Sequence, residues 1–453
     1  MRKVFLASVA SMGALLAAGG AANAQPVKPV APGTIAVHVN GYFQFGLDHV
    51  GSTYNNVGGN KLNPVTTNGE FRLYPGFDAT TIGGIAYGAQ VETRVTFSDA
   101  NKGATTQSNS TAGTSSLYVR RAYGYIGTPD YGYVRYGQTD GAFSLLQTGV
   151  IEQFGDGAQF ASTDSTSLYV VPTKAIPGEF IYADQGALYT TDKVVLISPS
   201  YEEPYMGGKL SAMASYEPNS NGLKEGYATC SVAGATCAAV SSSNGFAGTN
   251  LANERQNTFD VAGQYALKAY GFNSKMSVGF LDGSPVRYTG PITGTTVIGT
   301  TTYNNASFNL DRLQVMQVGL QTTYKGLFLD GDAITVGANA KWGQTLDGYA
   351  PKPVGTRDAV GYIVGGNYVV GPYVVGASFW DGQSAGNYLP GAKEARTLSE
   401  YGLSAGGNYV IGKDMSLYLQ YMYGHSHQPG NGNFTNKNNS QMQMVSIGST
   451  LKW

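Results

Sequence analysis

Apolar and polar side chains alternate along most of this chain of 453 residues. Between residues 34 and 48, apolar side chains recur at odd positions from Ile35 to Leu47, and polar ones such as His38 and Gln44 fall at even positions. An alternation with a period of two is typical of a β-strand that has one apolar and one polar face. The same contrast returns in 87–98, 314–324, 334–342 and 415–423.

Sixteen segments carry this pattern and form the predicted strands. Their lengths suit a bilayer crossing, because a tilted transmembrane strand needs roughly nine to eleven residues. Barrels of about sixteen to eighteen strands enclose an aqueous channel, whereas barrels of about eight do not. The segments lie near 34–48, 69–79, 85–98, 115–127, 131–138, 191–199, 208–217, 257–267, 274–282, 311–324, 332–344, 357–369, 373–380, 398–410, 414–424 and 440–453.

The connections between these segments alternate in length. Long connectors lie near 49–68, 99–114, 139–190, 218–256, 283–310, 345–356, 381–397 and 425–439, and a shorter link follows each of them. Transmembrane barrels have this asymmetry, with long extracellular loops and short periplasmic turns. Such a sheet must close on itself, because a lipid-exposed edge would leave backbone amides unpaired in hydrocarbon. The sequence therefore predicts an all-β fold, a transmembrane antiparallel β-barrel that spans residues 34–453.

The N-terminus has the pattern of an export signal. Arg2 and Lys3 supply positive charge, an apolar stretch runs over 4–18, and Ala22-Asn23-Ala24 offers a site for cleavage between small residues. This pattern predicts a secretory signal peptide over residues 1–24. Residues 25–33 would then form a short linker before the barrel.

Composition and charge narrow the range of partners and activities. Only 13% of the residues are charged, and the chain has 32 Tyr and 63 Gly, which suits strands and turns. Without residues 1–24, 26 basic residues face 29 acidic ones, a balance of −3 that indicates no nucleic-acid partner. No metalloprotease spacing, nucleophile elbow or phosphate-binding glycine motif occurs. We therefore expect no enzymatic activity, no metal and no cofactor.

Two cysteines, Cys230 and Cys237, have six residues between them in a stretch rich in Gly, Ser and Ala. An exported protein meets oxidising conditions, so the spacing predicts a local disulfide. A metal site and two free thiols are the alternatives, and a metal site would need more Cys or His residues nearby.

Strand parity places several charged residues on the inner face of the predicted barrel. If Phe71 and its apolar neighbours face lipid, Arg72 points inward, and the same rule turns Glu92, Arg94 and Arg120 inward. Inward placement is also favoured energetically, because a basic residue on the lipid face costs about 2–4 kcal/mol at the membrane midplane. Three arginines would then line the second, third and fourth strands.

Arg121 does not fit this parity. If Val119, Tyr123 and Tyr125 face outward and Arg120 faces inward, Arg121 faces out as well. Three explanations are open: Arg121 lies at a subunit interface, it reaches a lipid headgroup, or the parity breaks at this point.

Two neighbouring segments resemble the fourth and fifth strands of the trimeric general porins of Gram-negative bacteria: VRRAYGYIG at 119–127 and YGYVRYG at 131–137. The strand plan extends the resemblance over nearly all of 34–453. The resemblance implies a sixteen-stranded barrel, a homotrimer, and a water-filled channel for passive diffusion of small hydrophilic solutes and ions. It also implies a place in the outer membrane, in contact with lipid and lipopolysaccharide, and insertion by the outer-membrane assembly machinery.

In that family the third extracellular loop folds into the barrel and narrows it, and here the connector 139–190 has the matching place and length. Within it, residues 151–156 resemble the family's Glu-Phe-Gly-Gly-Asp stretch, with Gln153 interrupting the match. By this resemblance, Glu152 and Asp156 are constriction acids that oppose Arg72, Glu92, Arg94 and Arg120 on the wall. The alternative is that these charges only wet the channel.

The C-terminal strand ends on an aromatic residue. Val445, Ile447, Leu451 and Trp453 share one face. This end resembles the C-terminal signature that the outer-membrane assembly machinery recognises, although the family usually ends in Phe. An ordinary edge strand that happens to end on Trp is the alternative.

Three hypotheses for function remain at this point. The first is a general diffusion porin. The second is a substrate-selective porin for sugars or organic acids, in which aromatic side chains in the lumen form a stacking track. The third is a surface barrel without transport, an adhesin or an outer-membrane hydrolase. Stepwise conductance in a planar bilayer would favour the first two hypotheses over the third.

Overall fold

The structure, a computed structural model, describes most of the chain from residue 30 onward. The exceptions are 54, 57–60, 99–116, 158–190, 206, 220–254, 286–294, 299–300, 305–309, 346–350, 353, 386–396 and 428–438. The predicted signal peptide, most of the linker 25–33, and both Cys230 and Cys237 lie outside the described residues.

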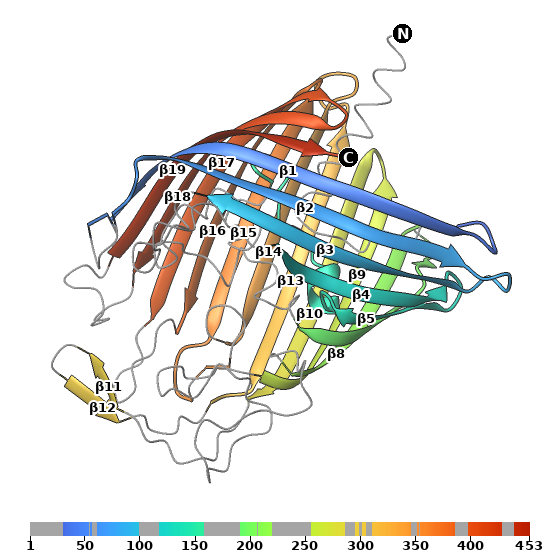
Figure 1. Cartoon of the computed structure of the whole chain (residues 1–453), viewed down its shortest axis with the longest axis horizontal. Coiled ribbons are helices and arrows are strands. Elements are labelled where there is room, and N and C mark those ends of the chain that lie inside the picture. The colour runs from blue at the N-terminus through green and yellow to red at the C-terminus, as the bar shows by residue number, and fades with distance from the viewer. Residues whose placement is uncertain are drawn as a thin grey trace.

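The chain folds into one closed antiparallel barrel (Figure 1). Its sheet has 17 strand segments, but β6 and β7 both pair with β8 and together form one interrupted strand, so the barrel has sixteen. The bounds are β1 Ile35–Ser52, β2 Val65–Thr80, β3 Ala86–Ser98, β4 Tyr118–Thr128, β5 Gly132–Gln138, β6 Asp192–Ile197, β7 Tyr201–Glu202, β8 Lys209–Asn219, β9 Arg255–Ala269, β10 Phe272–Pro285, β13 Leu313–Lys325, β14 Ala333–Gln344, β15 Ala359–Val370, β16 Tyr373–Ser384, β17 Leu398–Gly412, β18 Met415–His427 and β19 Asn439–Lys452.

The predicted strand number and order are confirmed, and each of the sixteen expected segments overlaps one barrel strand. The short β7 lies just outside the expected segments, and a hairpin and a helix were not expected. A hairpin of β11 (Thr295–Ile298) and β12 (Thr301–Asn304) lies in the long connector between β10 and β13, where Thr and Ile favour strand pairing. A short helix, α2 (Ala142–Leu145), lies in the connector after β5, and four residues are too few to leave a helical pattern in the sequence.

The two faces of the strands differ as the alternation predicts. On β1, Val37 is 77% exposed, while Gln44 and Asp48 are only 1% exposed. Exposed apolar side chains therefore form the outer surface, which suits hydrocarbon, and polar side chains are buried on the inner face. The long connectors and short turns alternate as expected, so the short turns, the start of β1 and the end of β19 lie at the same end of the barrel. Among the described residues, no helix has the length and apolar character of a membrane span.

The barrel closes between β1 and β19, which pair antiparallel from Tyr42 opposite Lys452 onward. The last residue continues this pairing, because the Gly41 amide donates to the Trp453 carbonyl oxygen at 3.1 Å and the Trp453 amide donates to the Gly41 carbonyl oxygen at 3.2 Å. The indole of Trp453 lies over Gly41 and reaches Phe71 on β2, with ring centroids 5.7 Å apart. Trp453 thus bridges three strands at the seam.

A side chain at Gly41 should disturb this closure, because a Cβ there would overlap the indole of Trp453. We expect Gly41→Val to lower the fraction of barrel that is folded in the membrane, measured by heat-modifiable gel mobility. Gly412→Val is the matched control, because a Cβ at Gly412 meets no atom within 4 Å. An unchanged folded fraction in Gly41→Val would show that the seam does not depend on the seating of Trp453.

Candidate functional site

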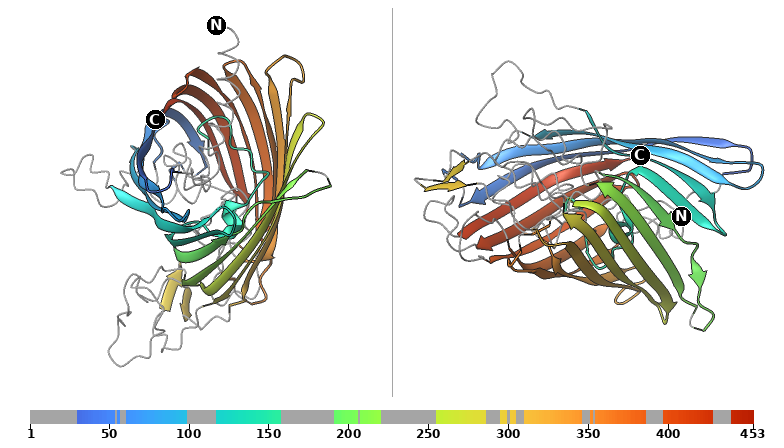
Figure 2. Two further views of the ribbon diagram at one scale, coloured as in Figure 1. Left: turned by 90° about the vertical axis from the view of Figure 1, so that its right-hand side faces the viewer. Right: turned by 90° about the horizontal axis from the view of Figure 1, so that it is seen from below.

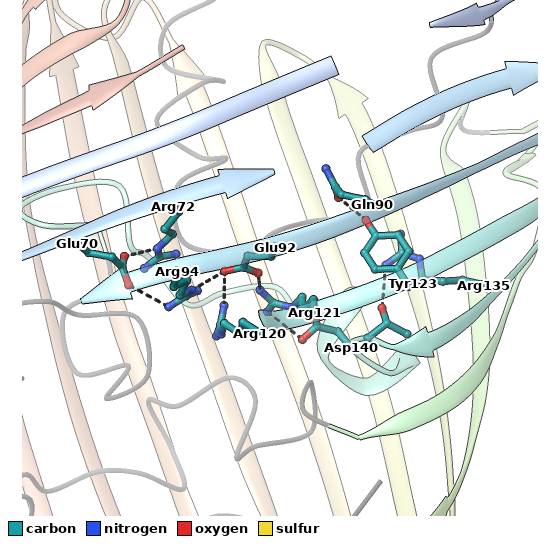
Figure 3. Close-up of polar contacts among 11 residues, drawn as sticks. Glu70, Arg72, Gln90, Glu92, Arg94, Arg120, Arg121, Tyr123, Arg135 and Asp140 are labelled. Carbon is teal, nitrogen blue, oxygen red and sulfur yellow. Dashed lines mark hydrogen bonds and ion pairs between the residues drawn. The ribbon is translucent and has the colours of Figure 1, made fainter. Parts of the chain in front are cut away.

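The inner face of β2, β3 and β4 carries a row of buried charges (Figure 3). Arg72, Glu92, Arg94 and Arg120 are 6%, 2%, 0% and 5% exposed. Their neighbours along each strand carry the outward apolar side chains, among them Val119, which is 51% exposed. The inward parity predicted for these four residues is therefore confirmed.

The charges alternate along this row. Glu70, two residues before Arg72 on β2, forms an ion pair with Arg72 and accepts from Arg94 Nη1 at 3.2 Å. The Nε of Arg94 donates in turn to Glu92 Oε1 at 2.5 Å. Arg94 thus joins β2 to β3 through two carboxylates. Charge-assisted hydrogen bonds of this kind fix a guanidinium in one orientation.

Glu92 is the centre of the row, because it binds three guanidiniums. Besides Arg94, it accepts from Arg120 Nη1 at 3.3 Å and from Arg121 Nη1. The Nε of Arg121 lies 2.8 Å from Oδ2 of Asp140, just beyond β5. These contacts continue the network from β2 to the start of the connector that follows β5.

A β-bulge explains why Arg121 also faces inward. Glu92 on β3 pairs with Arg121, whereas the next residue, Thr93, pairs with Val119, so Arg120 is the extra residue of β4. A bulge turns two successive side chains toward the same face and ends strict alternation. Of the three explanations for Arg121, the break in parity is therefore the one that the structure supports, and Arg121 is 3% exposed.

The bulge also corrects the orientation of the tyrosines that follow it. Tyr123 and Tyr125 were expected to face lipid, but both point inward: Tyr123 donates to Gln90 Oε1 at 2.5 Å, and Tyr125 donates to Asp78. Arg135 on β5 stacks on Tyr123, with its guanidinium carbon 4.3 Å from the ring centroid.

We name the inner surface formed by Arg72, Arg94, Arg120, Arg121 and Arg135 the arginine wall. The carboxylates among these arginines are Glu70, Glu92 and Asp140 (Figure 3). Among the described residues of this surface, five guanidiniums against three carboxylates leave an excess of two positive charges.

The segment 141–157, which we name the inner segment, lies inside the barrel and crosses its inner surface from β8 to β18. Helix α2 at its start is visible within the barrel in Figure 2 (left). The amide of Ala142 donates to Ser215 Oγ on β8 at 3.2 Å, and the amide of Asp156 donates to Gln420 Oε1 on β18 at 2.7 Å. The prediction that the third extracellular loop folds inward is therefore confirmed for residues 141–157, while 158–190 lie outside the described residues.

Polar side chains on successive strands bind the backbone of the inner segment. Thr148 donates from its amide to Ser277 Oγ on β10 at 3.1 Å and accepts at its carbonyl oxygen from Asn339 Nδ2 on β14 at 2.9 Å. Further along, Asn408 Nδ2 on β17 donates to the Gly155 carbonyl oxygen at 2.8 Å. Because these bonds are spread over many strands, they fix the position of the inner segment against the inner face of β10, β14 and β17.

Glycines on the same strands let the segment approach closely. A Cβ at Gly319 on β13 would overlap the carbonyl oxygen of Thr148, and one at Gly337 on β14 would lie 2.8 Å from the carbonyl oxygen of Gly149. The obstructing atoms belong to backbone, which cannot rotate away. We name these two glycines the seat glycines.

The two predicted acids lie at the far end of the inner segment. Asp156 is 7% exposed, and Glu152 is half-buried. Gln153, which interrupts the family motif, accepts from Asn367 Nδ2 on β15 at 3.0 Å, so it anchors the segment. Phe154 is 1% exposed and packs against Val374 on β16. The motif thus combines two anchoring side chains with two carboxylates.

Lys193 joins the two ends of the connector between β5 and β6. Its Nζ donates to the carbonyl oxygens of Thr139 at 2.9 Å and Thr191 at 3.3 Å, the first and last residues between β5 and β6. Glu217 on β8 lies 3.4 Å from this Nζ and also accepts from Arg255 Nε on β9 at 2.9 Å. The lysine therefore holds both ends of the connector at one point.

This arrangement consists of fixed charges and anchored backbone, and it can orient and select charged or dipolar solutes. Among the described residues, no group of three or more His, Cys, Asp or Glu side chains could hold a metal ion. Sequence reasoning missed Glu70, Arg135 and Asp140. Glu70 shares the parity of Arg72, and Arg135 lies between the outward Val134 and Tyr136, so parity alone could have indicated both.

A family model described as Gram-negative porin matches residues 8–428 of the chain. Among solved structures, a double mutant of the porin of Rh. blastica is 14% identical, covers 92% of this chain and 100% of its own, and has a TM-score of 0.45. A triple mutant of the Rhodopseudomonas blastica porin is 15% identical with the same coverage and a TM-score of 0.46. No protein of curated function matches the sequence.

Proposed function

Because the chain belongs to the Gram-negative porin family, and is thus an outer-membrane channel, we propose that it is a general diffusion porin narrowed between the arginine wall and the inner segment. The observation that carries this proposal is the row of alternating charges from Glu70 to Asp140 on one side of a lumen whose other side holds residues 141–157. The channel would pass small hydrophilic solutes and ions by passive diffusion.

In this proposal Arg72, Arg94 and Arg120 form the basic side of the constriction, with Glu92 as the carboxylate among them, and Glu152 and Asp156 form its acidic side. Charges of opposite sign across a narrow lumen set up a transverse field that aligns polar solutes and disfavours long apolar ones. Arginine suits the basic side because its charge cannot be titrated away near neutral pH. The ion pairs with Glu70 and Glu92 would hold the guanidiniums still while solutes pass.

The remaining parts of the proposal concern export and assembly. Residues 1–24 would be removed as a signal peptide, Cys230 and Cys237 would form a disulfide, and Trp453 would be read by the outer-membrane assembly machinery. The mature barrel would be a homotrimer in contact with lipid and lipopolysaccharide, without cofactor or enzymatic activity. The seating of Trp453 at the seam supports its role in assembly, because recognition and closure would involve the same residue.

Reconstitution in a planar bilayer tests this function. We expect stepwise increases in current, each from one inserted assembly, with a conductance that rises with salt concentration. A barrel that is folded by heat-modifiable gel mobility but passes no current would contradict the channel function and favour a surface role such as adhesion. Current that saturates and is blocked by one solute at low concentration would favour a selective porin instead.

A further inference from the structure

Arg135 differs from the other arginines of the arginine wall. Arg72, Arg94, Arg120 and Arg121 each form an ion pair with at least one carboxylate. Among the described residues, Arg135 has no carboxylate within ion-pair distance, although it is only 5% exposed.

The contacts of Arg135 leave part of its guanidinium unused. Its Nη1 donates to Thr139 Oγ1 at 3.4 Å, near the outer limit of a hydrogen bond, and its guanidinium carbon lies over the Tyr123 ring, 4.3 Å from the ring centroid (Figure 3). Within the part of the chain that the structure describes, its buried Nε has no hydrogen-bond partner. Stacking on an aromatic face offsets part of the cost of burying a cation, but it satisfies no N–H donor.

The unused edge of the guanidinium has the geometry of a carboxylate site. Since Nη1 is engaged by Thr139, the edge formed by Nε and Nη2 is the one left among the described contacts, and such an edge can donate two parallel hydrogen bonds to the two oxygens of a planar anion. Because Nε is buried, an anion that accepts from both donors must first displace a side chain that covers it. A buried charge without a counter-charge is costly, and an incoming carboxylate would supply both the counter-charge and the missing acceptor.

The surroundings of this edge are apolar and aromatic. In the strand register, Arg135 lies opposite Tyr125 on β4 and opposite Val195 on β6. These two neighbours are 9% and 0% exposed. The ring of Tyr125 meets that of Tyr133 edge to face, with centroids 6.3 Å apart. Lys193 adds a second cation nearby, because its Nζ donates to the carbonyl oxygen of Thr139, whose hydroxyl accepts from Arg135. Aromatic surface beside two cations suits an anion whose remainder is apolar better than a fully hydrated inorganic anion.

We propose that Arg135 binds the carboxylate of small organic anions as they pass through the channel, with the tyrosines beside it packing against the organic part. The site lies beside the row of paired charges, so a carboxylate meets Arg135 without competing against Glu70 or Glu92. This inference rests on the proposed channel function. It adds that, among the solutes that pass, small organic carboxylates stay bound to the arginine wall longest.

The test replaces chloride by benzoate at constant potassium concentration and measures single-channel current in planar bilayers. Benzoate should block the wild-type channel with a saturable concentration dependence. Arg135→Gln should raise the half-blocking concentration about tenfold or more, because it removes charge-assisted hydrogen bonds. Arg135→Lys should also weaken the block while keeping the ion preference, because lysine retains the charge without the two-donor edge.

Arg312→Gln is the matched control. Arg312 is an arginine outside the strands whose guanidinium pairs with Asp282 and whose side chain is 55% exposed, so its loss should leave the block unchanged. Equal half-blocking concentrations in wild type and Arg135→Gln would overturn the proposal, and so would block by inorganic phosphate as strong as that by benzoate. A wild-type barrel without current would contradict the channel function itself, whereas current that benzoate leaves unaffected would contradict only the site at Arg135.

Discussion

Replacing Arg120 with glutamate should move the reversal potential of the channel toward cation preference in a KCl gradient. The arginine wall holds five guanidiniums against three carboxylates, and the substitution makes this four against four, so the excess of two positive charges disappears. Arg120→Gln should lie between the two, with an excess of one. Arg120 is a suitable position for the test because it is the extra residue of the bulge and forms an ion pair with Glu92 on the inner face.

The measurement needs low ionic strength, because the Debye length is about 10 Å at 0.1 M salt and only about 3 Å at 1 M. Arg312→Glu is the control, since it makes the same change of charge on an exposed side chain outside the strands. Reversal potentials that do not fall in the order wild type, Arg120→Gln, Arg120→Glu would show that Arg120 is not part of the constriction.

The barrel could be predicted from the sequence because membrane and lumen impose opposite demands on alternate residues. Val37 and Gln44 on β1 illustrate the contrast, one mostly exposed to the surroundings and the other buried. Every barrel strand repeats this contrast, so sixteen segments could be marked without knowing which strands pair. The hairpin of β11 and β12 pairs outside the barrel sheet, and it was not predicted.

The arginine wall was only partly predictable, because parity carries information along a strand only as far as the next irregularity. Arg120 and Arg121 are adjacent and chemically identical, so no feature of either residue indicates a bulge between β3 and β4. Beyond the bulge, every residue changes face, which is why Tyr123 and Tyr125 were assigned to lipid. Strict alternation would place one of two adjacent arginines toward lipid, which is energetically unfavourable. This conflict was the sign that the alternation is interrupted.

The hydrogen bonds that anchor the inner segment to the strands could not be predicted at all. Ser277, Asn339 and Asn408 are recognisable as inward polar residues, but nothing local to them indicates that they bind the backbone of residues 148–155 rather than water. The partners are separated by more than a hundred residues in sequence. Such contacts follow from the closure of the barrel, which sets the distance between distant strands.

Replacing the seat glycine Gly319 with valine should lower the single-channel conductance and make the open current noisy. A side chain at Gly319 would overlap the carbonyl oxygen of Thr148. The inner segment must therefore move away from β13 toward the lumen and lose its hydrogen bonds with Ser277 and Asn339. Gly263→Val is the control, because a Cβ at that strand glycine would lie 3.9 Å from the nearest atom, an ordinary contact. A Gly319→Val barrel that folds and conducts with unchanged amplitude and noise would mean that the position of the inner segment does not set the width of the channel.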